Sequence, residues 1–422
     1  MHRSIVIFTQ LLVALGSAWM APTLAKLNEP DFPLELTTYQ VSWFASIHDL
    51  GKIAGPIITS SLLDSLGRKY TLASTTICIS FSFLCMIFVR DIHLICAARV
   101  LYGLGNGIFD VVAAIYTAEN CSPTFRGVMS SLVYFSVAGT LLGEMILATY
   151  LSYIDSILVN AAMTVIAFAT FYYATETRYF LISKGKHEEA EKNLIWLSGD
   201  GSGRVVSDEL RRIQLSIDEE KQKSQSLKLR LISPANLKGL CLVFSIHVLT
   251  MGTGLSAINT YGELIFSPSE TFGAKEYMIL YSAANWFAVA VSLFLIERIN
   301  RRILVIGCYI GITVSHMFSY LLMNSRNNGY QSVLYPWLIF GSVTLYGICF
   351  YLMAPVIFAL RGELLPFSVR ALGNSMAIIG FSISSFGICL SFIPVSENFG
   401  MENNFLIYFV VSFLAAIFVH LT

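Results

Sequence analysis

Acidic and basic side chains recur at the same spacings in the two halves of this chain. In each half one acid precedes an arginine by four residues, and another acid precedes an arginine by seven. The pairs are Asp64 with Arg68, Glu119 with Arg126, Glu297 with Arg301 and Glu363 with Arg370. Each pair stands at the end of an apolar run, where charge-assisted bonds between helix ends could latch one conformation and break in another. The alternative is that these charges serve only to orient the chain in a membrane.

Other sets of residues that carry out chemistry are missing from the sequence. It has no nucleophile beside a base, no cluster of histidine or cysteine ligands and no Walker lysine after the glycine-rich run 103–107. The eight cysteines lie mostly in or beside apolar runs, and none forms a CxxC pair. We therefore predict that the protein is not an enzyme and binds neither metal nor cofactor.

Four ionisable residues lie inside apolar runs, where a charge is expensive and indicates a function. They are Asp49, Lys52, Asp110 and Glu144. Asp49 and Lys52 are one helical turn apart, so we expect them to neutralise each other. Asp110 has no partner nearby in the sequence, so it is a candidate for coupling through a proton or a cationic solute.

Membrane helices must hold these residues in place. The composition of 55% hydrophobic and 13% charged residues, with a mean hydropathy of +0.67, excludes a soluble multidomain protein. We predict an all-α polytopic membrane protein with 12 transmembrane helices in two pseudo-symmetric six-helix bundles. A signal peptide is the alternative for the first of these segments. The predicted spans are 4–24, 42–63, 70–90, 93–118, 127–149, 153–175, 237–260, 276–297, 302–323, 333–360, 370–393 and 403–421. The short charged connection within 62–70 predicts a hairpin between two antiparallel membrane helices.

The only sizeable polar segment divides the chain into three parts. We predict an N-terminal six-helix bundle at 1–175, a cytoplasmic linker at 176–236 and a C-terminal six-helix bundle at 237–422. Two stripes of apolar residues at helical spacing predict short helices in the linker. These stripes are Ala190, Leu194 and Leu197, and Leu210, Ile213 and Ile217.

Basic residues indicate how the chain is oriented. The even-numbered connections contain 20 lysines and arginines, and the odd-numbered ones contain four. Because positive charge accumulates on the cytoplasmic side, we place the linker and both termini there. We expect a multi-pass protein of the plasma membrane whose surroundings are the lipid bilayer, with no nucleic acid and no obligate protein partner.

Several stretches resemble the sugar porters of the major facilitator superfamily, and within them the insect facilitated trehalose and glucose transporters. They include GPIITSSLLDSLGRK (55–69), RVLYGLGNG (99–107), NWFAVAVSLFLIERINRR (285–302) and APVIFALRGELLPFSVR (354–370). The resemblance covers nearly the whole chain and implies alternating access around a central site. It also implies a cytoplasmic charge network of Arg68, Glu119, Arg126, Glu176, Glu297, Arg301, Glu363 and Arg370.

The sugar site that the resemblance implies is only partly preserved. Asn259 and Asn285 stand at positions where the family keeps sugar-binding asparagines. Tyr134 and Thr253 stand where it keeps glutamines, and Phe358 replaces a tryptophan. With Ser256, these residues still offer amides, hydroxyls and ring faces to a sugar.

These features together predict facilitated, uniport transport of a small sugar such as trehalose or glucose. The first helix has no acid between Ile5 and Lys26, whereas proton-coupled sugar porters usually place one there, so the resemblance favours facilitated diffusion. A proton-coupled symporter, a transporter of another small solute and a nontransporting sugar sensor remain open as alternatives. The short ends of the chain indicate a trimmed or partial sequence.

Overall fold

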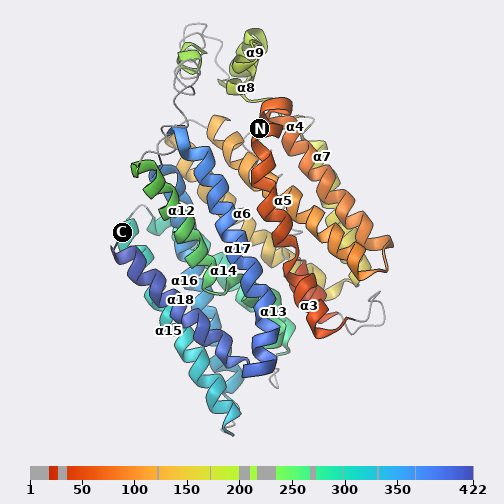
Figure 1. Ribbon diagram of the computed structural model, residues 1–422, viewed down its shortest axis with the longest axis vertical. Coiled ribbons are helices and arrows are strands. Elements are labelled where there is room, and N and C mark those ends of the chain that lie inside the picture. The colour runs from red at the N-terminus through yellow and green to blue at the C-terminus, as the bar shows by residue number, and fades with distance from the viewer. Residues whose placement is uncertain are drawn as a thin grey trace.

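The computed structural model describes residues 19–26, 36–120, 123–171, 173–198, 210–215, 234–266, 272–296, 298–329, 332–365 and 367–421, and the regular structure within them is α-helical. The long helices run side by side, and α8 and α9 stand at one end of them, here named the linker end (Figure 1). The opposite end, where α3 begins, is named the far end. The helices are α2 (Met20–Ala25), α3 (Thr38–Ser46), α4 (His48–Phe88), α5 (Ile92–Asn120), α6 (Pro123–Tyr150), α7 (Tyr153–Thr170), α8 (Arg178–Ser183), α9 (His187–Ser198), α12 (Pro234–Gly252), α13 (Leu255–Ile265), α14 (Ala274–Leu295), α15 (Arg301–Asn327), α16 (Tyr335–Glu363), α17 (Phe367–Phe399) and α18 (Glu402–Leu421).

The lengths and apolar character of these helices suit a bilayer. Within the described ranges, nine helical segments are long and apolar enough to cross a membrane. One of them, 38–88, contains two of the predicted spans, and the apolar part of α6, 134–147, is shorter than the others. The first predicted span lies mostly outside the described residues. The prediction of an all-helical, polytopic fold is confirmed.

The chain reverses direction within α4 at Gly67, where the sequence predicts a helical hairpin. Gly67 has φ 85° and ψ −179°, a conformation that only glycine adopts readily. A Cβ atom there would also lie 2.5 Å from Glu176 Oε2 and 2.7 Å from Phe180 Cε1. The corresponding turn in the second half separates α14 from α15, where the Asn300 side chain accepts a hydrogen bond from the backbone N–H of Arg302.

The predicted span 237–260 is interrupted rather than continuous. Helix α12 ends at Gly252, and α13 begins at Leu255 after Gly254, which has φ 100°. A Cβ atom on Gly254 would lie 2.6 Å from Cδ2 of Tyr408, so the chain needs glycine here for both backbone conformation and space. Such breaks free backbone groups in the middle of a membrane span and commonly line sites in transporters.

Glycines of the run 103–107 let α4 and α5 approach closely. A Cβ atom on Gly103 would lie 1.8 Å from the backbone oxygen of His48, and one on Gly107 would lie 2.6 Å from that of Lys52. Small residues at such crossings allow backbones to pack without intervening side chains.

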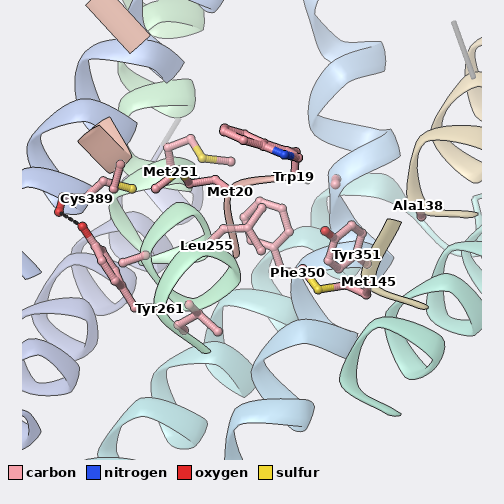
Figure 2. Packing of buried hydrophobic residues seen from close by; sticks show 14 of the residues in the cluster. Trp19, Met20, Ala138, Met145, Met251, Leu255, Tyr261, Phe350, Tyr351 and Cys389 are labelled. Carbon is pink, nitrogen blue, oxygen red and sulfur yellow. Dashed lines mark hydrogen bonds between the residues drawn. The ribbon is translucent and has the colours of Figure 1, made fainter. Parts of the chain in front are cut away.

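The two bundles meet along several pairs of helices. Helices α3 and α4 lie against α17, α2 lies against α13, and α6 lies against α14. Their shared apolar core draws on both halves: Met20 and Met145 come from the first half, and Met251, Leu255 and Tyr351 from the second (Figure 2).

The linker forms a small cluster of its own at the linker end. Ala190 and Leu194 of α9 are buried, in agreement with the first predicted stripe. Ile213, from the helical segment 210–215, packs with Leu181 and Ala190. Ile217 lies outside the described residues.

Gly103→Ala should destabilise the fold, because its Cβ would collide with backbone and push α4 and α5 apart, and overpacking of this kind costs about 1–3 kcal/mol. Gly307→Ala in α15 is the matched control, since nothing lies within 4 Å of its Cβ position. It should leave stability unchanged or raise it by up to about 1 kcal/mol through helix propensity. Thermal unfolding of the purified variants checks both, and equal melting temperatures would contradict the close packing.

Candidate functional site

One face of α16 contacts three of the residues that the sequence predicts to bind solute. Gly347, Tyr351 and Phe358 are four and seven residues apart, so at about 100° per residue they fall within about 40° of one another around the helix. We call these three residues the α16 stripe.

Asn259 meets the middle of the stripe. It lies on the second turn of α13, the helix that starts after the break at Gly254. Its side chain is hydrogen-bonded to the hydroxyl of Tyr351 and remains partly exposed. An amide with four possible hydrogen bonds therefore retains capacity for a further partner.

Asn285 of α14 meets the stripe at Gly347. It is 4% exposed, its amide interacts with the Tyr281 hydroxyl, and no described group bonds to its Oδ1 atom. A Cβ atom on Gly347 would lie 2.3 Å from that oxygen, so the glycine makes room for the amide. A buried acceptor without a partner is uncommon in proteins and calls for an explanation.

Tyr134 of α6 meets the stripe at Phe358, across the boundary between the bundles. The two ring centroids are 4.6 Å apart and their planes are inclined by 52°. The ring of His247 on α12 also contacts Phe358, edge-on, with the two ring centroids 5.6 Å apart. The structure thus brings together two of the predicted ring residues from opposite halves of the chain.

The remaining two predicted residues have different surroundings. Thr253 is fully buried at the α12–α13 break, where its hydroxyl donates to the Thr250 carbonyl at 2.7 Å and lies 3.3 Å from the Tyr346 hydroxyl. Ser256 is partly exposed, and its Oγ lies 2.7 Å from that of Ser385 on α17. Both hydroxyls have protein partners, so Ser256 differs from Thr253 only in being partly exposed.

The combined groups suit a neutral compound with many hydroxyls. Asparagine amides both donate and accept, tyrosine hydroxyls do the same, and ring faces cover apolar C–H groups. Sequence reasoning missed Gly347 and Tyr351, although their spacing from Phe358 places them on one helical face. The contacts of these residues with Asn259 and Asn285 are visible only once the helices are packed.

A second polar group lies at the linker end. Arg68 Nη2 donates to Glu119 Oε1 at 2.8 Å, with both side chains largely buried. Arg178 donates to the backbone oxygen of Glu119 at 3.3 Å. This group joins the start of the second part of α4 to the end of α5.

Glu176 caps the helix that restarts after Gly67. Its carboxylate accepts backbone N–H bonds from Arg68 at 3.0 Å, from Lys69 at 3.1 Å and from Thr177 at 2.8 Å. Burial raises the pKa of Glu176 above its ordinary value, while these donors act in the opposite direction. A carboxylate at a helix N-terminus also meets the positive end of the helix dipole.

The other half of the predicted charge network is only partly visible. Arg301 begins α15 and is described. Glu297 and the side chains of Arg126, Glu363 and Arg370 lie outside the described residues. The structure therefore places Arg68, Glu119 and Glu176 together at the linker end, and the latch that they would form remains a prediction.

The ionisable residues within the spans have partners that are distant in sequence. Lys52 Nζ lies 2.9 Å from Asp110 Oδ2, which gives Asp110 the partner that the sequence did not reveal. Asp49, expected to neutralise Lys52, is instead hydrogen-bonded to Ser385. Glu144 accepts a bond from Asn160 at 2.9 Å. The sequence identifies these residues because they are ionisable within apolar runs, but their partners are known only from the folded structure.

Comparison with known sequences identifies relatives along nearly the whole chain. The family model described as "Sugar (and other) transporter" matches residues 11–422. A facilitated trehalose transporter Tret1 of Anopheles gambiae is 26% identical, covering 98% of this chain and 54% of the relative. One of Culex quinquefasciatus is 25% identical, covering 97% and 80% respectively. The chain thus spans about half the length of the Anopheles relative.

Solved structures share the fold at low sequence identity. The xylose transporter XylE from E. coli, in a partially occluded inward open conformation, matches with a TM-score of 0.82 and 15% identity over 99% of this chain and 97% of that one. A POT family peptide transporter matches with a TM-score of 0.69 and 12% identity, over 100% and 95%. The arrangement is that of the major facilitator superfamily. Together with the family match over residues 11–422, it shows that this chain belongs to the sugar porter family, the sugar (and other) transporters.

Proposed function

We propose that this chain is a facilitative transporter that carries a sugar such as trehalose or glucose down its gradient by alternating access. The α16 stripe carries this proposal, because it brings two amides, a tyrosine hydroxyl and a ring pair to one face. Asn285 supports it further, since its unpaired buried oxygen could accept a sugar hydroxyl. The insect relatives are facilitated trehalose transporters, which favours trehalose as the solute and transport without a coupling ion.

The proposal includes a location and an orientation. The protein would reside in the plasma membrane with the linker and both termini in the cytoplasm, in accord with the excess of basic residues in the even-numbered connections. It would need no catalytic step, no cofactor and no obligate protein partner. The linker end would then face the cytoplasm, and the far end the outside.

Cells expressing this chain should take up labelled trehalose or glucose saturably, at a rate that is the same at two external pH values. Asn259→Ala should lower Vmax/KM about tenfold or more, because it removes an amide and leaves Tyr351 without its partner, and 1.4 kcal/mol corresponds to tenfold. Asn398→Ala, at an exposed position of α17, is the matched control and should transport normally. Uptake that rises with acidity would indicate proton coupling, and surface expression without uptake would point to another solute or a sensor.

Gly347→Ala should impair uptake by displacing Asn285, since the new Cβ would lie 2.3 Å from Oδ1. Gly341→Ala, in the same helix, has no atom within 4 Å of its Cβ and should keep wild-type uptake. We expect at least a tenfold difference in Vmax/KM between the two variants at equal surface expression. Equal uptake by the two variants would show that Asn285 does not contribute to the solute site.

We also propose that Arg68, Glu119 and Glu176 form the first half of a cytoplasmic latch, with Arg126, Glu297, Arg301, Glu363 and Arg370 completing it. The bond between Arg68 and Glu119 supports this role, because both side chains are largely buried and a bond between charged groups is worth about 1.5–3 kcal/mol. Such a bond can hold one conformation and break in the other.

Arg68→Ala and Glu119→Gln should each slow uptake at least fivefold, and the double variant should be no worse than either alone. Non-additivity is expected because each substitution removes the same bond. Lys186→Ala, which breaks an exposed pair with Glu189, is the control and should have little effect. Additive losses measured by initial uptake rates would argue against a functional pair.

A further inference from the structure

Asp49 is an ionisable residue deep within a membrane span. It is 1% exposed and lies 11 residues after Thr38, which places it about 16 Å along the helical path from the far end. A carboxylate at such a depth is expensive and is retained where it has a function.

Asp49 makes a polar contact between the two bundles. Its Oδ2 atom lies 2.6 Å from the Ser385 hydroxyl of α17, which lies 2.7 Å from the Ser256 hydroxyl of α13. Ser385 is the donor in both contacts and shares its one proton between the Asp49 carboxylate and Ser256 Oγ, while Ser256 donates to Met251 Sδ at 3.6 Å. A chain of two hydrogen bonds therefore joins α4 of the first half to two helices of the second.

A chain of polar contacts within the first bundle leads from the carboxylate through the His48 ring to the positive charge of Arg99. His48 Nε2 lies 3.5 Å from Asp49 Oδ1, and Arg99 Nη2 lies 3.5 Å from His48 Nδ1. Arg99 also donates to the backbone oxygens of Phe44 and Ala45, both at 3.2 Å, which fixes it at the end of α3. These contacts remain within the first half of the chain, so only the bond to Ser385 depends on where the second half lies.

Ser256 connects this contact with the candidate site. It precedes Asn259 by three residues and so lies one turn away on α13. When the bundles are together at Asp49, α13 is held by Ser256, and Asn259 is held against Tyr351.

We propose that Asp49 is a positioning residue that sets how readily the two bundles close at the far end. When the far end closes, the Ser385 hydroxyl replaces water as the hydrogen-bond donor to the carboxylate. When it opens, water again hydrates the carboxylate. Closure also fixes the helix that carries Asn259. This inference rests on alternating access as the proposed function, but its test uses no sugar, so the two fail separately.

The test measures how often the far end opens in the purified protein. A cysteine replaces Trp43, whose ring lies 6.0 Å from Phe386 of the other bundle, in a chain whose eight native cysteines are changed to alanine. The rate of modification by a maleimide reports opening. A second chain carrying Val333→Cys, at a position that is 81% exposed, should react at one constant rate whatever the other substitutions.

Ser385→Ala should raise the rate at position 43 about tenfold, because it leaves a buried carboxylate without its donor when the bundles close. Asp49→Asn should not raise it, since an amide loses less on burial and its oxygen still accepts from Ser385. The double variant should react within about threefold of Asp49→Asn, because the charge that opposes closure is gone.

Two results would overturn the proposal. One is a Ser385→Ala rate equal to that of the parent. The other is an Asp49→Asn rate as high as that of Ser385→Ala, which would mean that the contact contributes packing alone. Ser256→Ala is the second variant if Ser385→Ala fails to fold; it should raise the rate about threefold by removing the hydroxyl that helps to hold Ser385 beside Asp49, and an unchanged rate would again refute the role.

Discussion

The lack of hydrogen-bonding partners in lipid governs the interior of this protein. A charged group that enters a span is therefore stabilised by pairing with another part of the chain. Lys52 and Asp110 neutralise each other at 2.9 Å, Asp49 is bonded to Ser385, and Arg99 donates to backbone carbonyls. Because lipid cannot replace these partners, each pair also limits how the helices that carry it can move.

The same constraint explains where the helices are broken and where they touch. The break before Gly254 exposes backbone groups in the middle of a span, and the Thr253 hydroxyl, which bonds to the Thr250 carbonyl, supplies one partner there. Where α4 and α5 cross at Gly103, the lack of a side chain brings the two backbones into contact. Interruptions and close crossings thus occur where glycine permits the geometry and a hydroxyl or a backbone group satisfies the hydrogen bonds.

Local sequence patterns were enough to predict the helices. They were not enough to predict which distant residues contact each other in the fold. Apolar runs located the spans, and the charged turn at Gly67 predicted the hairpin. Asp110 showed no partner, because Lys52 is 58 positions away and only helix packing brings it near. The prediction of a continuous span at 237–260 missed the break, because mean hydropathy over a whole span does not register the two glycines at 252 and 254. The role of the α16 stripe was missed because its contacts come from four other helices, α6, α12, α13 and α14.

Two departures from the family pattern, at positions 134 and 358, affect side chains that contact each other in the structure. The resemblance to sugar porters implies a glutamine at position 134 and a tryptophan at position 358, where this chain has Tyr134 and Phe358, whose ring centroids are 4.6 Å apart. Phenylalanine is smaller than tryptophan and tyrosine is larger than glutamine, so aromatic volume has moved from α16 to α6 while the space between them stays filled. In the site that we propose, the exchange would remove an amide and keep a ring face, which would shift recognition from hydrogen bonding towards stacking. Polar recognition would then fall mainly on Asn259 and Asn285, the two asparagines that meet the same face of α16.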